Sequence, residues 1–205
     1  FTGTAGSGTD GIKSVTIALA DNFGTPSYGA DGAGTTTYAL LLSAANVGSG
    51  LFAIDATAAN GKGAEILLNK VGNDIVGTVA GVEYFRIAVE ADGDVVFTLA
   101  DNKPIWHATT GTTTGEDGQH DDTSTLTLDG AGEFLQIQQT VTDADGDTAS
   151  AAIDLGAGVF KVEDDGPKLG TPAAVTETAT LDESSPVFTG TAGSGTDGIK
   201  SVTIA

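Results

Sequence analysis

The sequence contains no cysteine and no methionine, and only 8 of its 205 residues are lysine or arginine. Without cysteine the chain can form neither a disulfide nor a thiolate metal site, so its stability must come from packing or from another kind of metal site. Because so few cationic side chains cannot neutralise phosphates, we expect no binding to nucleic acid and no attraction to anionic lipid. No apolar run approaches the roughly 20 residues that a membrane-spanning helix needs, so we also expect no direct membrane insertion.

Acidic residues and glycine are the abundant classes. The 28 aspartates and glutamates give a formal net charge of -20, which favours cations or neutral surfaces as partners. Thirty glycines, five prolines and 40% hydrophobic residues suit many short strands joined by tight turns, and they do not suit disorder. The composition therefore predicts an all-β fold.

An internal repeat joins the two ends of the sequence. Residues 1–18 and residues 188–205 have the same eighteen letters, FTGTAGSGTDGIKSVTIA, at an offset of 187 positions. An engineered duplication would give the same pattern, but the interpretation we prefer is one full period of a tandem array plus the start of the next. Such a period is too long for a solenoid unit, so each repeat can hold a core of its own, and the partners we expect are neighbouring repeats.

Alternating or compact apolar runs, bounded by glycine, aspartate and asparagine, recur about every eight to twelve residues, which is typical of β-sandwiches. In residues 82–90, Phe85, Ile87 and Val89 share one face and Tyr84 and Arg86 the other. No stretch has a helical stripe. The predicted strands are 14–19, 35–42, 50–55, 64–69, 74–79, 82–90, 94–100, 103–107, 124–128, 134–142, 148–155, 159–162, 175–181, 186–189 and 199–205.

The number of strands predicts two immunoglobulin-like β-sandwich lobes. Residues 1–18 form a strand that duplicates 188–205 and begins a repeat, residues 19–120 form the first lobe, and residues 121–205 form the second lobe, completed by the start of the next repeat. Two topologies remain open. Either residues 1–18 pair with the first lobe, or both copies are equivalent strands of a lobe split across adjacent repeats, which is the topology we prefer.

The most informative local motif is Asp143-Ala144-Asp145-Gly146-Asp147. Three carboxylates at alternate positions around a glycine turn would repel one another, and a hard divalent cation with oxygen ligands relieves that repulsion. Calcium is the natural candidate. The alternative is a solvated hairpin in which aspartate and glycine serve only the turn. The motif resembles the start of an EF-hand loop, but its glycine comes two positions too early, so a helix-loop-helix site is excluded.

A second acidic group surrounds Gly166-Pro167, where the repeat has its natural seam. Ions bound there would stiffen the joint between neighbouring repeats, although the same charges would also keep a linker solvated and its edges unpaired. The carboxylates concerned are Glu163, Asp164, Asp165, Asp182 and Glu183.

Signals for catalysis are weak, and we expect no enzyme. His107 and His120 are the two histidines, and neither stands in a metalloprotease or nucleophile-elbow pattern. Trp106 is more typical of a core anchor than of a sugar platform. Residues 6–11 match G-x-G-x-x-G, but the residues that follow alternate like a strand, so this segment is interpreted as a loop.

Several of these motifs occur in an order that resembles a known family. They are YGADGAG at 28–34 followed by TYAL at 37–40, then VTDADGDTAS at 141–150, EDDGP at 163–167 and TLDES at 180–184. Together they resemble the extender repeats of giant repeats-in-toxin (RTX) adhesins.

The resemblance implies a bacterial surface fibre, exported by a type I system to the cell surface, whose repeats are spacers that project distal binding domains for adhesion or biofilm formation. It also implies that calcium orders and stiffens the fibre. Carried onto this sequence, the calcium chemistry falls on Asp143, Asp145, Asp147 and the second acidic group. The function we expect is therefore a calcium-stiffened spacer without a small-molecule ligand. The alternative function is a glycan- or peptide-binding sandwich module around Trp106 and residues 109–114.

Overall fold

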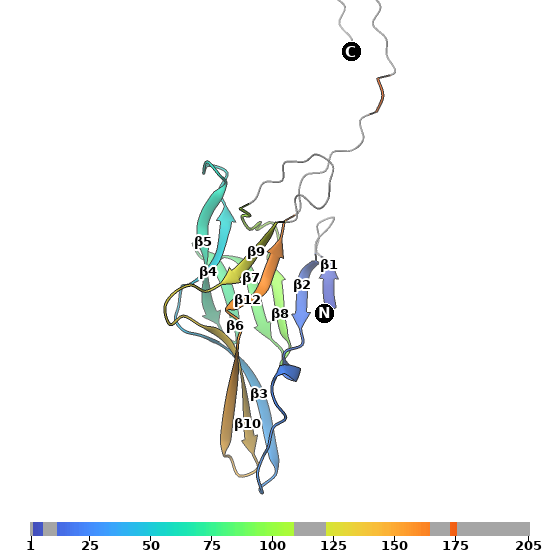
Figure 1. Cartoon of the computed structure of the whole chain (residues 1–205), viewed down its shortest axis with the longest axis vertical. Coiled ribbons are helices and arrows are strands. Elements are labelled where there is room, and N and C mark those ends of the chain that lie inside the picture. The colour runs from blue at the N-terminus through green and yellow to red at the C-terminus, as the bar shows by residue number, and fades with distance from the viewer. Residues whose placement is uncertain (1, 6–11, 109–121, 165–172, 176–205) are drawn as a thin grey trace, which may run out of the picture. The chain divides into compact units, whose positions relative to one another are not determined.

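A computed structural model describes residues 2–5, 12–108, 122–164 and 173–175 of the chain. The chain divides into two units, Phe1–Lys168 and Leu169–Ala205, and in the second unit only residues 173–175 are described. Apart from one 3-10 turn, Ala20–Asn22, the regular structure of the described residues is β-strand (Figure 1). The prediction of an all-β fold is therefore confirmed.

One layer of the first unit is a seven-stranded sheet in which all neighbouring strands run antiparallel. Tight turns connect most neighbouring strands of this sheet. Gly93, for example, at φ 94°, lies in the turn between the strands Val82–Val89 and Val95–Leu99. The strands, in their order across the sheet, are β1 (Thr2–Ala5), β2 (Ile12–Ile17), β8 (Val95–Leu99), β7 (Val82–Val89), β6 (Asp74–Val79), β5 (Lys62–Val71) and β4 (Val47–Ile54).

The other layer consists of two smaller antiparallel sheets. The first has the order β11-β10-β3, and the second pairs β12 with β9. These strands are β3 (Ala33–Leu42), β9 (Thr123–Thr127), β10 (Leu135–Asp143), β11 (Thr148–Asp154) and β12 (Ala157–Glu163).

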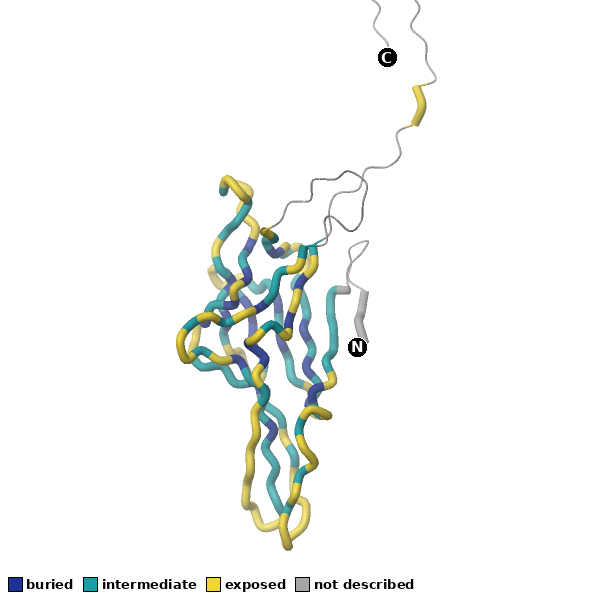
Figure 2. The backbone as a smooth tube through the Cα atoms, viewed as in Figure 1, coloured by how far each residue is buried: buried dark blue, intermediate teal, exposed yellow. Residues whose placement is uncertain are grey.

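Buried residues lie on strands of both layers (Figure 2), and they form one hydrophobic cluster, as expected for a β-sandwich. Phe85 and Phe97 of the large sheet are buried in one cluster with Leu40, Ile137 and Phe160 of the smaller sheets. The rings of Phe97 and Phe160 lie with their centroids 5.1 Å apart. Full burial of such a side chain stabilises the fold by about 1.5–3 kcal/mol, so these contacts hold the two layers together.

The boundary predicted at residue 120 does not separate two cores. β10, from the predicted second lobe, pairs along its length with β3 from the predicted first lobe. Leu126, Leu135 and Phe160 belong to the same buried cluster as Leu40 and Phe85. A period-2 pattern identifies a strand but does not indicate which distant strand pairs with it. The sequence therefore gives no sign that strands on the two sides of residue 120 share one core.

Strand positions follow the predictions closely between residues 35 and 100 and between residues 124 and 162. Residues 103–107 are the exception. They make only an isolated bridge, between Ile105 and Ala53, because Pro104 cannot donate a ladder hydrogen bond. Residues 1–18, which the sequence predicts as a strand, form two strands in their described part, β1 and β2, and β2 pairs with β8 of the predicted first lobe. The strands predicted at 175–181, 186–189 and 199–205 lie outside the described residues, apart from Val175, which is exposed and not in a strand.

Candidate metal centre

The candidate site lies where the start of β3 meets the hairpin between β10 and β11. The pairing of β3 with β10 ends in an irregular step that places Asp143 opposite Ala33. The backbone N–H of Ala144 donates to the carbonyl oxygen of Gly32 at 3.1 Å. A side chain at Gly34 would collide with the backbone carbonyl oxygen of Asp143, so glycine there permits the close approach of the two segments. This approach brings the loop before β3 beside the β10–β11 turn.

The turn itself is closed by Asp143. Its backbone N–H donates to the carbonyl oxygen of Asp147 at 3.0 Å. Its side-chain Oδ1 accepts the backbone N–H groups of Gly146, at 3.0 Å, and Asp147, at 2.8 Å. Gly146 adopts φ 105°, a backbone conformation that side chains strongly disfavour. The aspartate-glycine pattern of the motif therefore serves the turn, as the solvated-hairpin interpretation requires.

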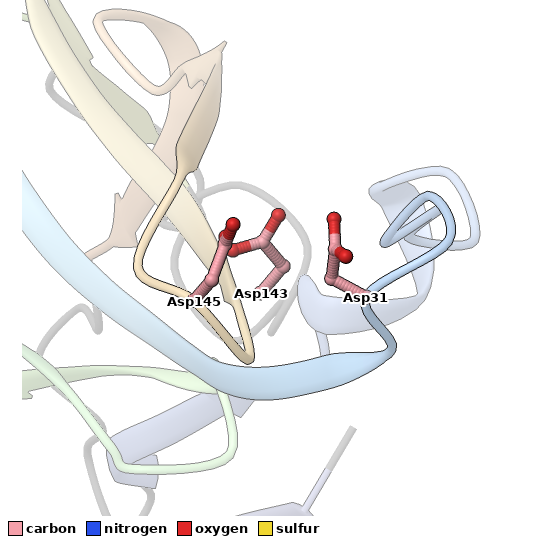
Figure 3. Close-up of side chains that lie close together, drawn as sticks. All are labelled: Asp31, Asp143 and Asp145. Carbon is pink, nitrogen blue, oxygen red and sulfur yellow. The ribbon is translucent and has the colours of Figure 1, made fainter.

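The same geometry also gathers three carboxylates (Figure 3). One carboxylate oxygen from each of Asp31, Asp143 and Asp145 lies within 4.8 Å of the others. Asp31 and Asp145 are exposed and Asp143 is half-buried. The pKa of Asp143 is lowered, first by a hydrogen bond with the side chain of Asp145 and then by the backbone N–H groups of Asp147, Gly146 and Asp145. Asp143 is thus held as an anion beside two further acidic groups.

Three oxygen donors at this spacing suit a hard cation. Calcium takes six to eight oxygen ligands at about 2.3–2.6 Å, from carboxylates, carbonyls and water, in a flexible geometry. Because the triad is open to solvent on two of its three members, water could complete the coordination. A transition metal that needs nitrogen or sulfur ligands is a poor match for an all-carboxylate set.

The sequence prediction named two of the three members. Asp143 and Asp145 come together as expected, whereas Asp147 is absent from the triad and contributes its backbone to the turn. Asp31 was missed. Asp31 belongs to residues 28–34, which the sequence marks only through their resemblance to a family motif. The pairing of β3 with β10 brings Asp31 close to Asp143, and this pairing leaves no local signal in the sequence.

The second acidic group does not form a comparable cluster in the part of the chain that the structure describes. Glu163 is the exposed last residue of β12, and the backbone N–H of Asp164 donates to the carbonyl oxygen of Asp122 at 2.9 Å. Among the described residues, the one acidic triad is that of Asp31, Asp143 and Asp145. Asp165, Asp182 and Glu183 lie outside the described residues.

Trp106 is tied to its own chain. Its indole N–H donates to the carbonyl oxygen of Asn60 at 2.8 Å. Its ring packs edge-on against that of Phe52, with the two ring centroids 6.3 Å apart. The ammonium group of Lys62 lies 3.6 Å from the Phe52 ring centroid and 5.0 Å from that of Trp106. These contacts match the anchor interpretation, because the tryptophan's polar group and the cation-binding faces of the pair already have partners.

The remaining sequence candidates can be placed briefly. His107 lies 3.2 Å through Nδ1 from the hydroxyl of Ser124, while His120, residues 6–11 and residues 109–114 lie outside the described residues. Within the described residues, no helix is long and apolar enough to cross a membrane.

Comparison with known families places this architecture in a defined class. Residues 3–156 match the family described as "Domain of unknown function (DUF5801)". The match covers most of the chain, and the chain therefore belongs to this family. Comparison with curated proteins and with solved structures finds no match.

Proposed function

We propose that this chain is a structural spacer repeat of a bacterial cell-surface RTX adhesin, stiffened by calcium. The observation that carries the proposal is the duplication of residues 1–18 at 188–205 around a single sandwich unit. A repeat that has its own core folds as one domain, and a tandem array of such domains holds a distal domain away from a surface. The resemblance to extender repeats supports the same role.

Calcium at the aspartate triad would act on the least buried part of the unit. β11 is exposed along almost its whole length, and Figure 1 shows β3 and β10 extending beyond the end of the seven-stranded sheet. This end has little apolar burial to hold it. An ion shared by Asp31, Asp143 and Asp145 would join the start of β3 to the β10–β11 turn and would limit bending there.

The charge of the chain supports coupling between export and folding. With a formal net charge of -20, self-repulsion opposes compaction when calcium is scarce, which suits passage through a channel as an unfolded chain. Outside the cell, calcium that binds only the folded state would shift the equilibrium towards it. Folding would then follow secretion.

A thermal melt with calcium and with chelator tests the proposal. We expect millimolar calcium to raise the Tm by about 5 °C or more over the value in chelator, as selective binding to the folded state requires. Asp31→Asn should remove most of this gain. Asp129→Asn is the matched control, because it removes one exposed carboxylate from outside the triad and should keep the gain. An equal Tm with and without calcium in the unaltered chain would overturn the calcium part of the proposal.

The spacer role is tested separately on a glycan array. A spacer should give no reproducible hits with or without calcium, in agreement with the internal contacts of Trp106. Reproducible calcium-dependent binding to one glycan class would identify a binding module and contradict the spacer role, whatever the result of the melt.

A further inference from the structure

The strand β11 lies at the edge of its sheet, and its outer side has no partner strand among the described residues. The sheet has the order β11-β10-β3, so β10 alone pairs with β11 in this part of the chain. Every residue of β11 is exposed except Ile153, which is half-buried. Unpaired backbone groups along such an edge readily form hydrogen bonds with a further strand, and most proteins protect them.

Two other sheet edges of this unit are protected. At the edge strand β3, the ammonium group of Lys70 donates to the carbonyl oxygen of Leu40 at 2.7 Å. At the edge strand β4, the backbone N–H of Trp106 donates to the carbonyl oxygen of Phe52 at 2.7 Å. Within the described residues β11 has no such contact on its outer side, and residues 148–153 carry no charge. The edge of β11 is therefore open to a partner strand.

The hydrogen bonds at the two ends of the β10–β11 pairing show which backbone groups of β11 point outward. The backbone N–H of Asp143 donates to the carbonyl oxygen of Asp147, and that of Leu155 donates to the carbonyl oxygen of Leu135. Because hydrogen-bonded and non-hydrogen-bonded pairs alternate in an antiparallel ladder, every second residue of β11, from 149 to 153, bonds to β10. The residues whose backbone groups point away from β10 are Thr148, Ser150, Ala152 and Asp154.

A second copy of β11, running antiparallel and centred on Ala151, pairs with all of these outward groups. When Ala151 lies opposite Ala151 of the second copy, Ser150 lies opposite Ala152, and Thr148 lies opposite Asp154. The Thr148 hydroxyl would then donate to the Asp154 carboxylate, a charge-assisted hydrogen bond. No two carboxylates of β11 face each other in this register, so the strand is complementary to itself.

We infer that the β11 edge is a docking surface for β11 of a second copy of this chain. Two three-stranded sheets would become one continuous sheet across a twofold axis. The pairing uses both β11 edges, and Lys70 protects the β3 edge at each end of the joined sheet, so association stops at a dimer. This association goes beyond the spacer role, because it needs only β11 of each copy.

Single cysteines test both the docking and its register, because the chain has no cysteine of its own. Ala151→Cys places two thiols opposite each other in a non-hydrogen-bonded pair, where the Cα atoms are about 4.5 Å apart. Ala149→Cys is the matched control, because it is exposed on the same face of the same strand. Its two copies would lie about 13 Å apart along the strands, beyond the roughly 7 Å that a disulfide can bridge.

We expect the disulfide-linked dimer of Ala151→Cys to form at least about tenfold faster than that of Ala149→Cys, as measured on non-reducing gels during oxidation in air. Equal rates would indicate random collision, and a faster reaction of Ala149→Cys would indicate a different register. Either result overturns the inference.

Sedimentation of proteins without cysteine gives an independent test. Ala151→Lys should weaken dimerisation by about fivefold, because it places two ammonium groups opposite each other. Ala157→Lys, at an exposed position of β12, makes the same change in net charge and should not weaken the dimer. An equimolar mixture of Ala151→Lys and Ala151→Glu should restore dimerisation, because opposite charges then face each other. Absence of this rescue, or an unaltered chain that stays monomeric at millimolar concentration, would contradict the docking of β11 on β11.

Discussion

The side-chain Oδ1 of Asp143 accepts the backbone N–H of Asp147 at 2.8 Å, across the turn between β10 and β11. One carboxylate thus closes a hairpin and also stands in the acidic triad with Asp31 and Asp145. The two roles are compatible, because the hydrogen bond with the side chain of Asp145 and then those from the backbone N–H groups of the turn lower the pKa of Asp143. A turn residue and a candidate ligand are here the same group.

The lowered pKa of Asp143 predicts how stability responds to acid. A carboxylate whose pKa is lower in the folded state stabilises the fold above its unfolded pKa, near 3.9, and loses that contribution as the pH falls through the lower folded value. In chelator, the unaltered chain should exceed Asp143→Asn in unfolding free energy at pH 5, and the difference should shrink towards pH 2. Urea melts at several pH values measure it. The general loss of charge repulsion in acid affects both proteins and cancels in the difference.

Asp129→Asn is the control for this comparison, because it removes a carboxylate from outside the turn. Its curve should run parallel to that of the unaltered chain. A difference between Asp143→Asn and the unaltered chain that is the same at pH 5 and at pH 2 would contradict the assigned hydrogen bonds.

Charge reversal at Asp31 separates repulsion from ion binding. In chelator, Asp31→Lys replaces a carboxylate that faces Asp143 and Asp145 with an ammonium group, so attraction replaces repulsion. Because residue 31 and Asp145 are exposed, solvent weakens this attraction, and we expect the Tm in chelator to rise by only about 1 °C. The rise of the Tm in calcium should be lost. Melts of both proteins in chelator and in calcium measure it. A fall in Tm in chelator would mean that the three carboxylates do not repel one another in solution.

Much of the strand pattern could be predicted because it is local. Phe85 and Ile87 were placed on one face of a strand by alternation alone, and both are buried. The turn at Asp92-Gly93 follows from the needs of a tight hairpin, and Gly93 indeed has a positive φ. Such features depend on neighbours within a few residues.

The parts that could not be predicted depend on distant pairing. Nothing near Asp31 indicates that β3 lies beside β10, more than ninety positions further along the chain. For the same reason the sequence suggested two lobes, where β3 and β10 share one sheet. The two triad members that the sequence predicts, Asp143 and Asp145, lie in one short motif, whereas the third member, Asp31, lies in the loop before β3.

A buried glycine in β6 supplies a test of the packing. Gly77 lies opposite Phe85, and a Cβ there would fall within the contact distance of the buried ring. Gly77→Ala should therefore lower the unfolding free energy by about 1–3 kcal/mol through overpacking. Gly24→Ala is the matched control, because its Cβ would have no heavy atom within 4 Å, and it should change stability by less than about 1 kcal/mol. Equal effects of the two substitutions in urea melts would contradict the close contact of Gly77 with Phe85.

Phe160 of β12 tests whether both layers belong to one cooperative unit. Its side chain is 1% exposed and its ring lies 5.1 Å from that of Phe97 in the opposite layer. Phe160→Ala should cost about 3–5 kcal/mol, because it removes a large apolar side chain and leaves a cavity. Since the core is shared, the whole transition should shift as a single step in both fluorescence of Trp106 and far-UV circular dichroism. Val159→Ala, on the neighbouring residue that is 38% exposed, should shift it far less. Two separate transitions, of which Phe160→Ala moves only one, would restore the division of this unit into independent lobes.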